Sequence, residues 1–191
     1  MKFKEIEFKY NADNVSLSSF LEFCTGRKGL NKKIIASGYD HFYDKASDPD
    51  SFYRLRVGED FNQLTFKRKT SALNNIVRTE HNITLGKDVS EDQVKALISE
   101  HGYGYNTSIF KNCFIFCFDE HVFSYYTVFN TDMKETGRFI EIEASEDHPW
   151  TNEGEATAYI TMIEKLLRPL GISPQNRVKR SLYELNRKET K

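Results

Sequence analysis

The segment EIEFKY, residues 5–10, alternates between charged and apolar side chains without a break. Residues two apart in a β-strand point to the same side, so the two glutamates and the lysine would share one face, opposite Ile6, Phe8 and Tyr10. The same period of two recurs along the chain and indicates a protein built mainly from strands with one charged face. The expected strands lie at about residues 2–10, 39–44, 51–58, 62–69, 77–85, 112–118, 121–129 and 137–144.

Three other segments have the apolar spacing of helices. The first follows the opening strand, near residue 17. The second begins at Ser90, which forms a capping-box pattern with Gln93. The third has the clearest helical period, beginning at Asn152 and ending at Gly171. Helices should therefore flank the strands.

Two short turns, at residues 58–62 and 119–120, are typical of hairpin connections, so successive strands are expected to be neighbours. Together these patterns predict an α+β fold, an antiparallel sheet with flanking helices. The chain has 191 residues and contains no linker-like tract or fixed-period repeat. We therefore expect a single domain spanning residues 1–191.

Composition narrows the function classes. Apolar residues make up 39% and charged residues 29% of the chain, which predicts a soluble globule. The formal net charge is −1, which gives no support to a general nucleic-acid surface or a membrane surface. The N-terminal residues lack the apolar core of a signal peptide, and no stretch approaches the roughly 20 apolar residues of a membrane span. The sequence therefore predicts a cytoplasmic protein without a membrane partner.

The charged strand faces are sorted by sign. Acidic pairs lie in the first and last strands, as at Glu141 and Glu143, whereas basic pairs lie in the middle strands, as at Arg54 and Arg56. The simplest explanation is an antiparallel sheet with one face in water. If the sheet instead curls into a barrel with its apolar face outward, the charges line an interior where unpaired charge is costly. Such an interior would need a ligand that neutralises it.

A polyanion together with divalent cations would neutralise both signs. Converging carboxylates repel one another until a hard cation binds their oxygens, and phosphate oxygens accept hydrogen bonds from Lys and Arg. The candidate metal-binding carboxylates are Glu5, Glu7, Glu80, Glu141 and Glu143. The candidate phosphate-binding cations are Lys9, Arg54, Arg56, Lys67, Arg78 and Lys111.

These residues form a series of motifs that resembles a known family. EIEFK at 5–9 is similar to the ExExK signature of CYTH proteins, the triphosphate tunnel metalloenzymes, which include class IV adenylate cyclases, thiamine triphosphatases, inorganic triphosphatases and RNA triphosphatases. Further motifs follow in the family's order and extend the resemblance over nearly the full length. They are YRLR at 53–56, LTFK at 64–67, RTE at 78–80, GRFIEIE at 137–143, LGI at 170–172 and KRSLYEL at 179–185.

The resemblance implies an eight-stranded antiparallel β-barrel that forms a triphosphate tunnel. It implies Mg²⁺ or Mn²⁺ held by Glu5, Glu7, Glu141 and Glu143 with help from Glu80, and a triphosphate held by Lys9, Arg54, Arg56, Lys67 and Arg78. By the same resemblance Lys179 reaches the triphosphate, and Asp132 is the candidate for a family aspartate, with Asn130 competing. Two positions depart from the family pattern, Asn82 where a second acidic residue is usual and Cys113 where a basic one is common.

Three functions are compatible with this reading. The first is metal-dependent hydrolysis of inorganic triphosphate, a nucleoside or thiamine triphosphate, or an RNA 5′-triphosphate end, with Glu80 or Glu143 orienting or deprotonating the attacking water. The second is a class IV-type adenylate cyclase making cyclic AMP and pyrophosphate. The third is a non-catalytic triphosphate-binding sensor, which the departures at Asn82 and Cys113 motivate.

The remaining features have ordinary explanations. The five histidines are scattered without metal-ligand spacing, and the three cysteines are expected to be reduced. The aromatic run in residues 114–126 is expected to form core and helix-facing surface, with a base-stacking face or a homodimer face as alternatives.

Overall fold

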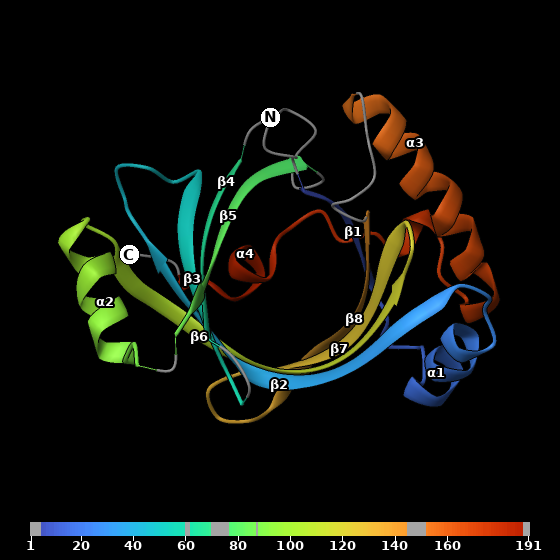
Figure 1. Cartoon of the computed structure of the whole chain (residues 1–191), viewed down its shortest axis with the longest axis horizontal. Helices are drawn as coiled ribbons and strands as arrows, with labels where there is room; N and C mark the ends of the chain where they lie inside the picture. The colour runs from blue at the N-terminus through green and yellow to red at the C-terminus, as the bar shows by residue number, and fades with distance from the viewer. Residues whose placement is uncertain (1–4, 60–61, 70–76, 87, 145–151, 189–191) are drawn as a thin grey trace.

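The computed structural model describes residues 5–59, 62–69, 77–86, 88–144 and 152–188 (Figure 1). Eight antiparallel strands close into a barrel in the order β1-β5-β4-β3-β2-β6-β7-β8. The strands are β1 (Glu5–Asn11), β2 (Leu30–Asp44), β3 (Ser51–Gly58), β4 (Asn62–Lys69), β5 (Val77–Leu85), β6 (Gly104–Phe118), β7 (His121–Phe129) and β8 (Glu135–Ala144). The helices are α1 (Leu17–Thr25), α2 (Glu91–Glu100), α3 (Glu153–Glu164) and α4 (Leu182–Asn186), with 3₁₀ turns η1 (Lys165–Leu170) and η2 (Pro174–Asn176).

The structure confirms the α+β class, the antiparallel barrel and all eight expected strands. Two strands are longer than expected, because β2 begins at Leu30 rather than residue 39 and β6 begins at Gly104 rather than residue 112. The added parts lack clean alternation and are held by pairing with the expected part of the neighbouring strand, as at Ile35 of β2 with Phe114 of β6 and at Tyr105 of β6 with Tyr43 of β2. Successive strands pair from β2 to β5 and from β6 to β8, but β1 joins the distant strands β5 and β8.

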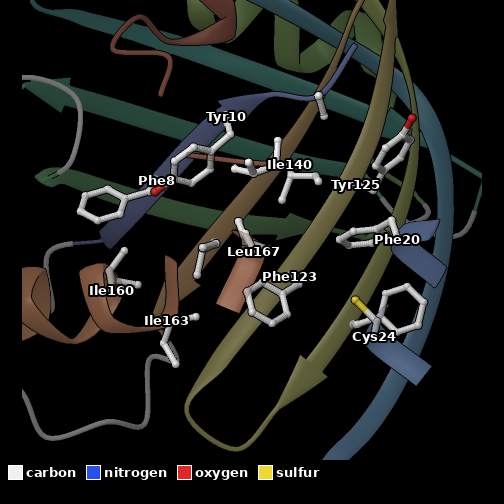
Figure 2. Close-up of a cluster of buried hydrophobic side chains, with 14 of the residues drawn as sticks. Phe8, Tyr10, Phe20, Cys24, Phe123, Tyr125, Ile140, Ile160, Ile163 and Leu167 are labelled. Atoms are coloured by element: carbon white, nitrogen blue, oxygen red, sulfur yellow. The ribbon is translucent and has the colours of Figure 1, made fainter. Parts of the chain in front are cut away.

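The main apolar core lies outside the barrel wall, between the strands and two helices (Figure 2). Phe8 and Ile140 project outward from β1 and β8 and are at most 1% exposed. Phe20 of α1 and Ile160 of α3 pack on this surface. Burial of such side chains contributes about 1.5–3 kcal/mol each. Since alternate residues point to opposite sides, the outward apolar face directs the charged face into the barrel.

The helix ends confirm the expected caps. Ser90 and Gln93 form the capping box of α2, and the Asn152 side chain accepts a hydrogen bond from the Glu155 amide at the start of α3. Gly171 ends η1 with φ 74°, a left-handed conformation that suits glycine. Among the described residues, no helix is long and apolar enough to cross a membrane.

The C-terminal segment runs back along β1 and places α4 at the barrel interior (Figure 1). The Val178 amide donates to the Lys9 carbonyl at 2.7 Å. The Tyr183 ring stacks on Phe52 with centroids 4.7 Å apart, and its hydroxyl donates to Asp44. Residues from α4 thereby become part of the interior surface.

A buried ion pair fastens this segment to the rest of the molecule. Arg177 pairs with Glu164, which is 3% exposed, and the guanidinium lies 4.1 Å from the centroid of the Phe8 ring. We expect Arg177→Met to lower the free energy of unfolding by about 3–5 kcal/mol, because it leaves a buried carboxylate unpaired. Urea unfolding of Arg177→Met and of Arg177→Met with Glu164→Gln would measure this. The double variant should recover most of the loss, and equal losses in both would contradict the explanation.

Candidate functional site

A cavity of about 260 Å³ lies inside the barrel, and every strand together with residues 181–183 contributes to its wall. Its described lining contains five cations and five carboxylates. The cations are Lys9, Arg54, Arg56, Lys67 and Lys111. The carboxylates are Glu7, Asp40, Glu80, Glu141 and Glu143. The two signs balance, and each of the five cations lies near a carboxylate of the cavity.

The carboxylates of Glu7 and Glu143 belong to directly paired positions of β1 and β8. Like charges at such positions repel. Burial, and then the neighbouring charge of Glu7, raises the pKa of the Glu143 carboxyl above its usual range. Ionising both carboxyls at this edge of the cavity is therefore unfavourable without a neighbouring cation.

Glu141 is held in place from two sides. The Lys9 ammonium lies 3.4 Å from its Oε1, and the Tyr126 hydroxyl donates to the same oxygen at 2.7 Å. Burial acts to raise the pKa of Glu141, but the charges of Lys9 and Lys111 and the Tyr126 hydrogen bond outweigh it, and the pKa is lowered. Glu141 is thus an ionised and oriented carboxylate.

Glu80 of β5 forms a second cluster. Its Oε2 lies 2.5 Å from the Lys67 ammonium, and its Oε1 lies 3.6 Å from the Arg54 guanidinium. Arg54 also donates to Thr65 Oγ1 at 3.0 Å, and Thr65 donates to Asn82 Oδ1 at 2.7 Å. At position 82 the amide side chain therefore completes a hydrogen-bond chain that positions Arg54.

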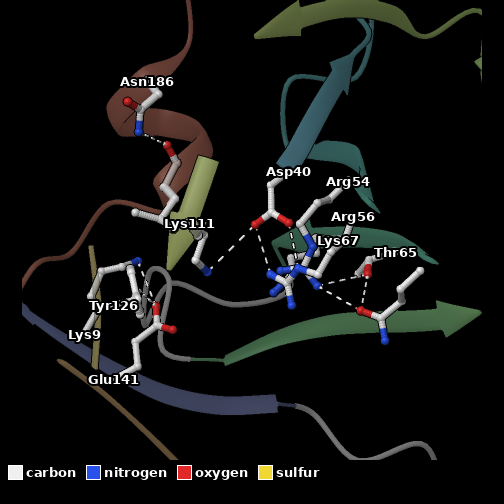
Figure 3. A network of polar contacts seen from close by, with 12 residues as sticks. Lys9, Asp40, Arg54, Arg56, Thr65, Lys67, Lys111, Tyr126, Glu141 and Asn186 are labelled. Atoms are coloured by element: carbon white, nitrogen blue, oxygen red, sulfur yellow. Dashed lines mark hydrogen bonds and ion pairs between the residues drawn. The ribbon is translucent and has the colours of Figure 1, made fainter. Parts of the chain in front are cut away.

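Asp40 of β2 forms the third cluster (Figure 3). Its carboxylate accepts two hydrogen bonds from Arg56, Nε to Oδ1 at 2.7 Å and Nη2 to Oδ2 at 3.0 Å. The Lys111 ammonium lies 3.8 Å from Oδ2 and 4.2 Å from the centroid of the Tyr126 ring. Burial opposes ionisation of Asp40, but Arg56 and Lys111 hold its pKa well below the usual range.

The cavity gathers nine of the residues predicted from the sequence. They are Glu7, Lys9, Arg54, Arg56, Lys67, Glu80, Lys111, Glu141 and Glu143. Two more, Glu5 and Arg78, are paired at adjacent positions of β1 and β5, but their side chains lie outside the described part of the structure.

Two predicted residues are not part of the cavity wall. Asp132 is exposed in the turn between β7 and β8, where its amide donates to Asn130 Oδ1 at 3.0 Å. Lys179 is exposed just before α4 and is not among the lining residues. Both had been placed by resemblance, and both side chains are exposed in the structure.

The sequence analysis missed Asp40 and Tyr126. Asp40 lies two residues before Phe42 in β2, so both side chains point to the same face. Because Phe42 is apolar, the sequence pattern did not show that this face turns inward and carries a carboxylate. Tyr126 was expected to pack in the core with its aromatic neighbours, yet it lines the cavity beside Ser124. Both residues could have been found from the period of two, because residues two apart in a strand share a face.

The donor set fits a hard divalent cation. Carboxylate oxygens are the ligands that Mg²⁺ prefers, and Mg²⁺ commonly takes one or two of them, with water and phosphate completing the octahedron. Among the described residues, no group of three or more His, Cys, Asp and Glu side chains is arranged to hold a metal ion. Glu7 and Glu143, at paired positions of β1 and β8, supply two carboxylates at one edge of the cavity, which is the number that Mg²⁺ commonly takes.

Comparisons with known proteins support this fold. The PH1012 protein from Pyrococcus horikoshii OT3 superposes with a TM-score of 0.73 at 20% identity, covering 95% of this chain and 98% of that one. A conserved hypothetical protein from Pyrococcus furiosus gives a TM-score of 0.72 at 19% identity, with coverages of 95% and 99%. A candidate adenylate cyclase from Vibrio parahaemolyticus gives a TM-score of 0.68 at 18% identity, with coverages of 97% and 98%.

The chain shares the fold of these proteins, a closed eight-stranded antiparallel barrel. At these identities the likeness is one of fold, and a fold alone does not determine a reaction. No protein-family model matches the sequence, and no curated protein sequence matches it either. The function of this barrel must therefore be argued from the residues of its cavity.

Proposed function

We propose that the protein is a divalent-metal-dependent phosphohydrolase that acts on a triphosphate-bearing substrate inside its barrel. The observation that carries the proposal is the cavity of about 260 Å³, whose described wall carries five cations and five carboxylates. A phosphate chain with a divalent cation complements both signs at once. The substrate is inorganic triphosphate, a nucleoside or thiamine triphosphate, or an RNA 5′-triphosphate end.

The cations of the cavity would bind the phosphate oxygens. Lys67 is 5% exposed, so a hydrogen bond from its ammonium to phosphate would form away from bulk water. Arg54 has its guanidinium fixed by Thr65 and contributes a planar set of donors. In the transition state these fixed charges stabilise the negative charge that develops on the transferred phosphoryl group.

The carboxylates would hold Mg²⁺ or Mn²⁺. Glu7 and Glu143 are the first candidates, and Glu141 is oriented beside them by Tyr126. A bound divalent cation would supply Lewis-acid polarisation of a phosphoryl oxygen. Either Glu80 or Glu143 accepts the proton of the attacking water, and Glu80→Gln, which leaves the paired glutamates intact, separates the two roles.

Product analysis tests the proposal. Purified protein is incubated with Mg²⁺ or Mn²⁺ and with tripolyphosphate, ATP, GTP, thiamine triphosphate and triphosphorylated RNA, and the products are resolved. Release of inorganic phosphate that stops on chelation with EDTA is the expected result. Formation of pyrophosphate and cyclic AMP would show instead that the protein is a cyclase. Triphosphate binding without any product would show that it is a non-catalytic sensor.

A further inference from the structure

We propose that Asp40 is a positioning residue that holds Arg56 and Lys111 in the orientation needed to bind the triphosphate. The inference rests on the proposed function, since it assigns a role within the same cavity. Asp40 would not touch the substrate. It would act through the two cations that it holds, and the evidence lies in its geometry, its burial and the identity of its partners.

The contact between Asp40 and Arg56 fixes a guanidinium group in one orientation. Asp40 is 2% exposed and accepts hydrogen bonds from Nε and from one terminal nitrogen of Arg56. Two of the five guanidinium N–H groups are used in this contact, and the other three remain for a ligand. The Arg56 side chain is 27% exposed and lines the cavity, so a phosphate can reach those donors.

The same carboxylate also restrains Lys111. The Lys111 ammonium lies between Asp40 Oδ2, at 3.8 Å, and the Tyr126 ring, at 4.2 Å from its centroid. Tyr126 in turn donates to Glu141, a proposed neighbour of the metal. One wall of the cavity is therefore a connected network that runs from Arg56 through Asp40 and Lys111 to Glu141 (Figure 3).

Asp40 differs from the other partners of the cavity cations. Lys9 pairs with Glu141, and Lys67 pairs with Glu80, and the proposed function gives both of those carboxylates a task with the metal or the water. The Asp40 carboxylate contacts Arg56 and Lys111. Its carboxylate can therefore keep the two cations in place throughout the reaction. Preorganised donors of this kind are the ones that contribute most to binding and catalysis.

Asp40→Glu tests positioning separately from charge. Glutamate keeps the negative charge but moves the carboxylate by one methylene group, which breaks the two-bond contact with Arg56. Affinity for imidotriphosphate, a triphosphate analogue with nitrogen bridges that resist hydrolysis, is measured with Mg²⁺ by calorimetry. We expect at least a 10-fold weaker affinity for Asp40→Glu. Asp48→Asn is the matched control, since it removes an Asp–Arg pair of 2.7 Å outside the cavity and should bind like the wild type.

A second pair of variants shows whether Asp40 acts through Arg56. In an Arg56→Gln background, Asp40→Glu should weaken the affinity by a clearly smaller factor than in the wild type, because only the contact with Lys111 is left to disturb. A loss of equal size in both backgrounds, or wild-type affinity for Asp40→Glu, would overturn the positioning role while leaving the proposed function intact. A wild-type protein that neither binds the analogue nor turns over any triphosphate would overturn both proposals.

The orientation of Arg56 can also be followed without a ligand. The Arg56 Nε–H proton is bonded to a buried carboxylate and should exchange slowly with water in nuclear magnetic resonance spectra. Exchange of that proton should accelerate at least 10-fold in Asp40→Glu, or in Asp40→Asn if the glutamate variant does not fold. Unchanged exchange would contradict the assignment.

Discussion

Glu143→Gln is expected to reduce metal-dependent triphosphate turnover by on the order of 10³-fold, the scale found when a charge-stabilising group is removed from an active site. Glutamine has nearly the same shape as glutamate, but it cannot offer a carboxylate to a divalent cation. Glu143 and Glu7 occupy paired positions, so one substitution removes half of the proposed carboxylate pair. Turnover at saturating Mg²⁺ or Mn²⁺ is the measurement.

At a pH above the raised pKa of Glu143, the same substitution should stabilise the metal-free protein by on the order of 1 kcal/mol, because it removes repulsion between like charges at paired positions. The direction also follows from the pKa of Glu143, which burial and Glu7 raise in the folded state. The folded protein keeps a proton that the unfolded chain has lost, so stability falls as pH rises between the two pKa values. Glu143→Gln should remove this part of the pH dependence.

Glu100→Gln provides the control for both effects, because Glu100 is an exposed carboxylate at the end of α2. It should leave turnover and thermal stability in EDTA unchanged. Wild-type turnover by Glu143→Gln would contradict the metal assignment. Lost turnover together with a lower melting temperature in EDTA would show instead that the carboxylate supports the fold.

Lys67→Met is expected to weaken triphosphate affinity about 10- to 100-fold, the range of a charge-assisted hydrogen bond worth about 1.5–3 kcal/mol. Methionine retains much of the apolar stem of lysine and loses the ammonium group. Lys67 lies inside the barrel at 2.5 Å from Glu80, so phosphate would have to compete with or share this partner. Calorimetry with imidotriphosphate and Mg²⁺ measures the change.

Arg68→Met is the matched control for Lys67→Met. Arg68 is the next residue of β4, points to the opposite side of the barrel wall and pairs with Asp48 at the surface. Removing this charge should leave the affinity within 2-fold of the wild type. A similar loss in both variants would indicate a general effect of net charge, and an unchanged affinity in Lys67→Met would exclude this lysine from the binding site.

Strand parity predicted most of the cavity wall. The alternation at Arg54 and Arg56, and again at Glu141 and Glu143, requires only that each segment be a strand, and the structure places all four side chains in the cavity. Period-two patterns are local, so they survive in a single sequence. The residues that decide which way the charged face points are apolar ones such as Phe8, which pack beneath the helices.

The rest depended on contacts between distant segments. Closure of the barrel pairs β1 with β5 and β8, and the start of each of β2 and β6 is a strand because it pairs with the end of the other. The contact between Asp40 and Arg56 likewise arises from the register of β2 on β3. Asp132 and Lys179 were placed by resemblance alone, and both are exposed and are not among the described residues that line the cavity.

A crystal structure of the protein soaked with imidotriphosphate and Mn²⁺ would test the central claim most directly. The account predicts phosphate density inside the barrel, within hydrogen-bond distance of Lys67 and Arg54, and an anomalous manganese peak beside Glu7 and Glu143. A cavity without phosphate or manganese at saturating ligand, or a triphosphate bound only to the outer surface of the barrel, would contradict it.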